Sequence, residues 1–138
     1  LAMDHLTTNQ VTLCPSVFIA RSLAKNGNNV YQYHFTRRRE GSEKILSYHG
    51  AEIPYVFNTH DEWLPTNEND IKLTKAMMEY WVEFAKKGTP NSINNPTWKE
   101  FGVEENYLIL DQTLENSAKL ENEFCEIMIK EMVQRGYR

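Results

Sequence analysis

The sequence has few glycines, and their spacing excludes several common catalytic motifs. The six glycines stand at positions 27, 41, 50, 88, 102 and 136. No two are four residues apart, so the chain has no G-x-S-x-G elbow of the kind that presents a nucleophilic serine. No two are two or five residues apart, which also excludes the dinucleotide fingerprint and the phosphate-binding P-loop. A self-contained hydrolase or nucleotide enzyme is therefore not expected from these residues alone.

Long apolar runs and an excess of positive charge are also missing. No run approaches the roughly 18 apolar residues that a membrane-spanning helix needs. The formal net charge is -4, so no general electrostatic attraction to nucleic acid is expected. The basic cluster Arg37-Arg38-Arg39 is followed at once by Glu40, which favours a solvated loop over a phosphate site. We therefore expect neither a membrane span nor a nucleic-acid partner.

The residues that are present are typical of an ordinary globular domain. Hydrophobic residues make up 41% and charged residues 25% of the 138 positions, a length that can bury a real core. Cysteine is scarce: Cys14 and Cys125 stand far apart and do not form the close pairs of a zinc site. The residues alone leave two alternatives open, two buried free thiols or one disulfide.

The order of apolar patterns predicts an α/β arrangement, because a helix leads directly into a strand. Helices are expected at 14–27, 69–88 and 119–134, one helical turn at 52–57, and strands at 30–35 and 106–111. Asn69 or Asp70 is expected to cap the second helix. The apolar stripe expected to enter the core from this helix comprises Leu73, Met77, Tyr80, Trp81 and Phe84. Two strands alone form a marginal sheet, which indicates that the chain needs a partner segment.

Histidine supplies the candidate catalytic group. The histidines at 5, 34, 49 and 60 do not form the H-x-x-x-H pair of a helical zinc site. His34 is interpreted as a sheet residue, and His60, in a polar loop, as solvated. His49 differs because a long loop after a strand delivers it, and Gly50 lets the backbone turn sharply behind it. Strand ends are where open sheets present catalytic groups, so His49 is a candidate base, with a surface histidine as the alternative.

Three ordered stretches carry a family resemblance: "LCPSVFIARSLAKNG" leading into "VYQYHF", then "YHGAEIPYVF", then "MMEYWVEFAKKGTPN" with "PTW" after it. Together they resemble the type-B carboxylesterase/cholinesterase family of α/β-hydrolases, which shows His-Gly-x-Glu before an aromatic-rich turn. The similarity runs from about Thr12 to the closing helix, and "FNTHDEWLP" is most similar to bacterial members. The resemblance implies an α/β fold class, the C-terminal part of an α/β-hydrolase fold containing the last strands of the central sheet with flanking helices.

The resemblance implies a role for His49 as the family's catalytic histidine, the general base that activates a serine for attack on an ester. The family runs Ser, acid, His along the chain, so 1–138 is expected to be the C-terminal segment of one domain. Serine, oxyanion-hole glycines and acid would precede Leu1. Glu52 matches the His-Gly-x-Glu carboxylate and is interpreted as site support, not as the triad acid. No cofactor or metal is implied; the expected partners are a small-molecule ester substrate and the N-terminal portion of the same esterase.

The resemblance also bears on the cysteines. Cys14 and Cys125 match positions that form a disulfide in secreted cholinesterase-like members, which implies a bridge and an extracellular or periplasmic location. Asn9 departs from the pattern, because many relatives carry an aspartate a few residues before the Cys-Pro, and the local hydrogen bonding is expected to differ.

Two further alternatives stay open. The first is a non-catalytic, neuroligin-type adhesion or binding module, against which the retained His49 argues. The second concerns aromatic residues near His49, which are expected either to line the site or to pack: Tyr48, Tyr55, Phe57 and Trp63.

Overall fold

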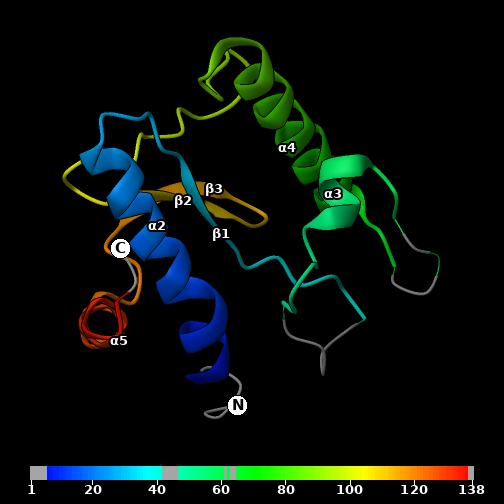
Figure 1. Cartoon of the computed structure of the whole chain (residues 1–138). Helices are drawn as coiled ribbons and strands as arrows, with labels where there is room; N and C mark the ends of the chain where they lie inside the picture. Colours follow the sequence, from blue (N-terminus) through cyan, green and yellow to red (C-terminus); the bar gives the residue numbers. More distant parts are fainter. Residues whose placement is uncertain (1–5, 42–46, 61, 63–64, 137–138) are drawn as a thin grey trace.

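The computed structural model describes residues 6–41, 47–60, 62 and 65–136 (Figure 1). Its elements are η1 (Asn9–Leu13), α2 (Cys14–Lys25), β1 (Gln32–Phe35), α3 (Ile53–Phe57), α4 (Glu68–Lys87), β2 (Asn106–Leu110), β3 (Leu114–Ala118) and α5 (Asn122–Gln134). The sheet has the order β1-β2-β3, with β1 parallel and β3 antiparallel to β2. It lies between the α3–α4 helices and the α2–α5 pair (Figure 1).

The main hydrophobic core lies between one face of the sheet and helices α3 and α4. Side chains alternate between the two faces of a strand, and the register places Tyr33 of β1 beside Leu108 of β2. Trp98, from the linker after α4, meets the rings of Tyr33 and Tyr80 at 6.2 and 5.4 Å between centroids. The buried members of this core are Tyr55, Leu73, Ala76, Met77, Tyr80, Trp98, Leu108 and Leu110.

Helix α4 confirms the predicted periodic segment, but the predicted cap was wrong. Asn67, not Asn69 or Asp70, has the extended backbone of a cap, and its side chain accepts hydrogen bonds from the backbone amides of those two residues. The Asp70 carboxylate accepts in return from the Asn67 amide at 3.0 Å, which completes a capping box. Gly88, with φ of +70°, ends the helix by donating to Phe84 O.

The predicted apolar stripe on α4 is only partly in the core. Leu73, Met77 and Tyr80 are buried, Trp81 is half-buried and Phe84 is 45% exposed. Among the described residues, the C-terminal end of the stripe therefore lies outside the buried core.

Strands β1 and β2 lie where the sequence predicts them, whereas β3 was missed. Its sequence, LENSA, is polar, and its side chains are half-buried or exposed because it is the outer strand of the sheet. Helix α5 begins at Asn122, later than predicted, because Lys119 and Glu121 take positive φ angles of 58° and 47° in the preceding turn.

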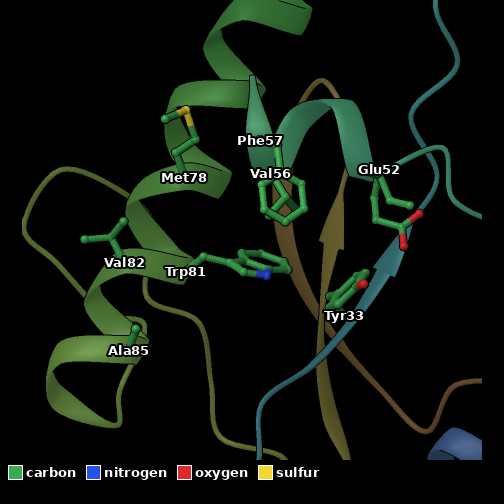
Figure 2. Close-up of a pocket in the computed structure, with 9 residues that line it drawn as sticks. Tyr33, Glu52, Val56, Phe57, Met78, Trp81, Val82 and Ala85 are labelled. Carbon is green, nitrogen blue, oxygen red and sulfur yellow. The ribbon is translucent and has the colours of Figure 1, made fainter. Parts of the chain in front are cut away.

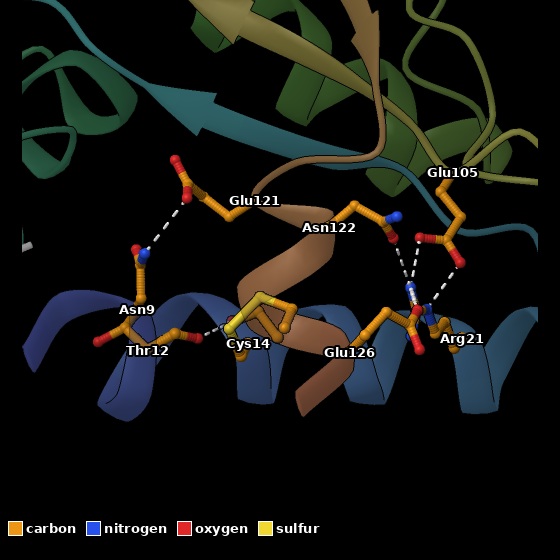
Figure 3. The surroundings of a disulfide bond; sticks show 10 residues. Asn9, Thr12, Cys14, Arg21, Glu105, Glu121, Asn122 and Glu126 are labelled. Carbon is orange, nitrogen blue, oxygen red and sulfur yellow. Dashed lines mark hydrogen bonds and ion pairs between the residues drawn. A yellow bond between two sulfur atoms is a disulfide. The ribbon is translucent and has the colours of Figure 1, made fainter. Parts of the chain in front are cut away.

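A second hydrophobic cluster joins α2 to α5 around a disulfide (Figure 3). The Cys14 and Cys125 sulfur atoms are bonded at 2.04 Å, and both residues are fully buried. Of the two alternatives that the residues left open, the structure therefore contains the disulfide. Asn9 of η1 is also buried and donates to Glu121 at 3.5 Å.

An ion-pair cluster links the α2–α5 pair to the loop before β2. Arg21 donates from Nε and Nη2 to the two carboxylate oxygens of Glu105, at 2.6 and 2.8 Å (Figure 3). Its Nη2 also lies 2.7 Å from a carboxylate oxygen of Glu126 on α5. This bidentate geometry orients the pair of helices relative to the start of β2.

Candidate active site

The loop after β1 brings His49 to the edge at which the parallel strands end. Because β1 and β2 run in the same direction, their carboxyl ends meet at this edge, where open α/β sheets present catalytic groups. The Thr36 amide donates to Leu110 O at 3.1 Å and continues the pairing past β1. Ser47, two residues before His49, donates from Oγ to Phe35 O at 3.0 Å. This bond holds the returning chain against the end of β1.

His49 lies in a tight turn. The Ala51 amide donates to Tyr48 O at 3.0 Å, so His49 and Gly50 are the two central residues. Gly50 has a φ of +86°, the left-handed conformation that a type II turn needs at its third position. The His49 side chain is exposed. The predicted sharp turn behind this imidazole is therefore present.

An apolar groove adjoins this loop between β1, α3 and α4 (Figure 2). It has a volume of about 450 Å³. Glu52, three residues after His49, is half-buried and is the one carboxylate among the lining residues that the structure describes. Burial, and then the nearby charge of Glu52, raise the pKa of Tyr33. The remaining lining residues are Ile53, Val56, Phe57, Met78, Trp81, Val82 and Ala85.

Two of the three arginines after β1 are buried, so the predicted solvated loop was wrong for them. Arg37 and Arg39 are 7% and 8% exposed, while Arg38 between them is exposed. This alternation has the period of two of an extended chain. Arg37 donates from Nε to Asp70 Oδ1 at 2.7 Å and from Nη2 to Asn67 Oδ1 at 3.3 Å.

Asp70 is a fully buried carboxylate with three donors. Its Oδ1 accepts from Arg37 and, at 2.7 Å, from the Tyr55 hydroxyl, and its Oδ2 accepts from the Asn67 amide. Burial alone would raise the pKa of Asp70, but the bonds from Arg37, the Asn67 backbone and Tyr55 outweigh it, so the pKa is lowered. Burial and the bond to Asp70 raise the pKa of Tyr55 to about 12. At neutral pH the network therefore contains a carboxylate and a protonated phenol.

His60 belongs to the same network, so its predicted solvated position was wrong. Its Nδ1 lies 2.8 Å from Arg39 Nη2 and its Nε2 lies 2.7 Å from Thr74 Oγ1, whose hydroxyl donates to Asp70 O at 2.8 Å. Because arginine only donates, these contacts assign a neutral imidazole with its proton on Nε2. The Arg39 guanidinium also lies 5.3 Å from the centre of the Tyr55 ring.

The other residues singled out from sequence have varied positions. His34 lies in β1 as predicted, with its ring 6.3 Å from that of Tyr107. Tyr55 packs within the network, whereas Tyr48 and Phe57 are 44% and 69% exposed. His5 and Trp63 lie outside the described residues.

Among the described residues, no group of three or more His, Cys, Asp or Glu side chains is arranged to hold a metal ion. No helix within those ranges combines the length and the apolar character needed to cross a membrane. Of the three histidines that the structure describes, His49 has an exposed side chain, whereas His34 and His60 are half-buried.

Comparison with known proteins identifies the family of this chain. Residues 1–128 match the model of the carboxylesterase family. Carboxylesterase 1E of Rattus norvegicus is 34% identical over 111 residues, covering 77% of this chain and 20% of that protein. The medium-chain fatty acyl-CoA hydrolase precursor of Anas platyrhynchos is 30% identical over 120 residues, covering 83% of this chain and 22% of that protein.

A solved structure is also similar. It is an esterase of the anaerobe Clostridium hathewayi that can hydrolyse aliphatic aromatic polyesters, and it superposes with a TM-score of 0.69 at 27% identity. The match covers 80% of this chain and 23% of that one. It confirms the predicted fold class, because the helices and small mixed sheet are those of part of an α/β-hydrolase fold.

The similarity covers most of this chain but only a small part of each relative. The chain spans about a fifth of the length of the curated relatives it matches. Because the family model matches nearly all of its residues, this chain belongs to the carboxylesterase family.

Proposed function

We propose that this chain is the C-terminal segment of a serine carboxylesterase and that His49 is the general base of ester hydrolysis. One observation carries the proposal. This chain belongs to the carboxylesterase family, and the histidine of its HGAE stretch lies exposed on an anchored turn at the carboxyl edge of two parallel strands. This is the place at which a base can meet a nucleophile supplied by neighbouring strand ends.

In the proposed mechanism, His49 accepts the proton of a serine hydroxyl as its oxygen attacks the ester carbonyl. The imidazolium then donates this proton to the oxygen of the departing alcohol, leaving an acyl-enzyme. For the second half-reaction, the neutral imidazole accepts a proton from water, which attacks the acyl carbonyl, and the proton returns to the serine. Imidazole is the side chain that most often carries out such transfers near neutral pH.

We infer that residues 1–138 complete a single α/β-hydrolase domain whose N-terminal portion supplies the serine, the oxyanion hole and the acid. The sheet supports this inference, because β1 pairs with β2 on one side only among the described strands. An open strand edge is a place where another strand can pair. Exposed apolar side chains on α3 and α4 also support this inference: Phe57, Met78 and Val82 are 69%, 38% and 46% exposed.

The substrate class that we propose is a small-molecule carboxylic ester, consistent with the apolar groove beside the His49 loop. An extracellular or periplasmic location is proposed on the strength of the Cys14–Cys125 disulfide, since such bonds persist in oxidising compartments. The bacterial grouping suggested by the FNTHDEWLP stretch stays a prediction.

The first test replaces the proposed base in the full-length esterase that contains this segment. His49→Ala is expected to lower kcat for p-nitrophenyl acetate hydrolysis by about 10⁴- to 10⁶-fold, because proton transfer to and from the serine is lost. His34→Ala, which removes a histidine from the sheet, is the matched control and is expected to retain most of the activity. Circular dichroism checks that both variants fold.

Two outcomes would contradict the proposal. Retention of more than a few per cent of kcat by His49→Ala would remove His49 from the mechanism. Ester turnover by purified residues 1–138 without a second polypeptide would remove the need for an N-terminal portion. An upstream elbow without serine would instead favour the neuroligin-type binding module.

A further inference from the structure

The two ends of the loop that carries His49 are in contact with each other. Arg39 precedes the loop and Tyr55 follows it, sixteen positions later along the chain. Arg39 Nε donates to the Tyr55 hydroxyl at 3.4 Å, and its guanidinium lies 5.3 Å from the centre of the Tyr55 ring. His49 therefore lies within a loop whose two ends are joined.

One buried carboxylate outside the loop joins the same two ends. Asp70, in the first turn of α4, accepts from Arg37 on the outgoing side and from the Tyr55 hydroxyl on the returning side. Both bonds are 2.7 Å long and end on the same oxygen, Oδ1. Because Asp70 is fully buried and also belongs to the α4 capping box, it is fixed relative to the helix.

On the returning side of the loop, a run of backbone hydrogen bonds links His49 to Tyr55. The Ala51 amide donates to Tyr48 O, the Ile53 amide to Gly50 O and the Tyr55 amide to Glu52 O, at 3.0, 3.1 and 3.0 Å. These bonds make residues 48–55 one unit that includes the His49 turn.

From this geometry we propose that Asp70 and Tyr55 are positioning residues for His49, an inference that rests on the proposed general-base role. Asp70 closes the His49 loop through Arg37 and Tyr55 and sets the place of the imidazole relative to the strand ends. A base displaced by about 1 Å loses much of its effect, because proton transfer needs a near-attack geometry. The Arg21–Glu105 ion pair has similarly short bonds but joins α2 to the loop before β2.

The test compares three variants of the full-length esterase. Tyr55→Phe removes only the hydroxyl that reaches Asp70, Asp70→Asn removes the charge at nearly constant shape, and Glu105→Gln removes the charge of the matched ion pair. With p-nitrophenyl acetate, kcat is expected to fall about 10- to 100-fold in the first two variants, while KM changes less than about threefold. Glu105→Gln is expected to keep kcat within about twofold of the unmodified enzyme.

A second readout does not depend on catalysis. Amide hydrogen exchange of peptides covering 47–57 is expected to accelerate in Tyr55→Phe and Asp70→Asn, because the turn loses its anchor. Peptides covering 14–25 and 122–134, in the disulfide-linked helices, are expected to exchange as before. Glu105→Gln is expected to leave exchange over 47–57 unchanged.

The outcomes separate this inference from the proposed function. An active His49→Ala variant overturns the general-base role, and positioning with it, whatever the exchange shows. If His49→Ala is inactive, the general-base role stands. In that case, unchanged kcat or unchanged exchange over 47–57 in Tyr55→Phe overturns only the proposal that Asp70 and Tyr55 position His49. Tyr55→Phe also decides the matter if Asp70→Asn fails to fold, since it keeps the Arg37–Asp70 ion pair and the aromatic ring.

Discussion

Asp70 is a charged side chain without solvent contact, and its hydration is replaced by protein donors. Arg37, Tyr55 and the Asn67 amide together occupy both carboxylate oxygens. Buried pairs of this kind contribute little net stability when compared with apolar replacements, but removing one partner typically costs about 3–5 kcal/mol, because the remaining charge is left uncompensated. The main effect of the network is therefore to determine that the chain after β1, helix α3 and the start of α4 meet. Its net contribution to the free energy of unfolding is smaller.

The lowered pKa of Asp70 leads to a prediction about acid stability. An unfolded chain takes up this proton near the ordinary pKa of 3.8, before the folded chain does. The stabilisation is therefore complete well above pH 3.8 and is lost as the pH falls through the lower folded pKa. The urea midpoint of the esterase is expected to fall between about pH 5 and pH 2.5, and less steeply in Asp70→Asn.

Glu79→Gln is the control for this measurement. The pKa of Glu79 is also lowered, first by a hydrogen bond from Ser92 and then by one from Asn94, but the carboxylate reaches solvent. Its replacement is expected to change the acid slope less than that of Asp70. Equal slopes for Asp70→Asn and the unmodified protein would contradict the assignment.

At the scale of elements, the sequence predicted those whose apolar period is clear. Helix α4 has such a period, and strands β1 and β2 are instead dense in aromatic or aliphatic residues. Strand β3 forms because β2 offers it a hydrogen-bonding partner, which the LENSA sequence does not reveal. The cap of α4 was misassigned because Asn67, Asn69 and Asp70 are all good cap residues. The backbone conformation of Asn67 decides between them.

The candidate site was predictable in part for a related reason. The HGAE stretch drew attention to His49 directly, but the partner of Arg37 lies 33 positions away in the sequence. A local charge pattern cannot show such a pairing, so the arginines were interpreted as solvated. The alternation of Arg37 and Arg39, with the Asn67–Asp70 spacing of a capping box, was the available signal.

The capping box gives a prediction for helix α4. Asn67→Ala removes the acceptor for the Asn69 and Asp70 amides and for Arg37 Nη2. The free energy of unfolding is expected to fall by about 1–2 kcal/mol, measured by urea titration at pH 7. Asn67→Asp keeps the acceptor and is expected to lose less. Asn69→Ala, in the same turn but outside the cap, serves as the control, and an equal loss there would contradict the role of Asn67.

At the scale of the whole molecule, the described residues form two hydrophobic clusters. One lies between the sheet and α3–α4, and the other surrounds the disulfide between α2 and α5, with no buried residue in common. The Arg21–Glu105 ion pair and the chain itself connect them. Clusters joined in this way are expected to open separately.

Reduction of the disulfide tests this arrangement. The bond closes a span of 111 positions, for which the chain-entropy model gives about 4–5 kcal/mol of stabilisation. In Cys14→Ser/Cys125→Ser, amide exchange over 14–25 and 122–134 is expected to accelerate while 106–110 keeps its protection. A titration of free thiols on the denatured, unreduced protein should find none at these two positions. Simultaneous loss of protection in both clusters would show that they open as one unit.

The parallel pairing of β1 with β2 has a consequence for the order in which the protein forms during translation. Gln32 pairs with Tyr107, so about 75 residues must be added after β1 leaves the ribosome before its ladder can close. At about 5–20 residues per second this delay is about 4–15 s. Throughout that interval the nascent chain contains His49 but not the strand whose end anchors Thr36 at the base of its loop. The hydrogen bond from Thr36 to Leu110 at the base of the His49 loop can therefore form only after this interval.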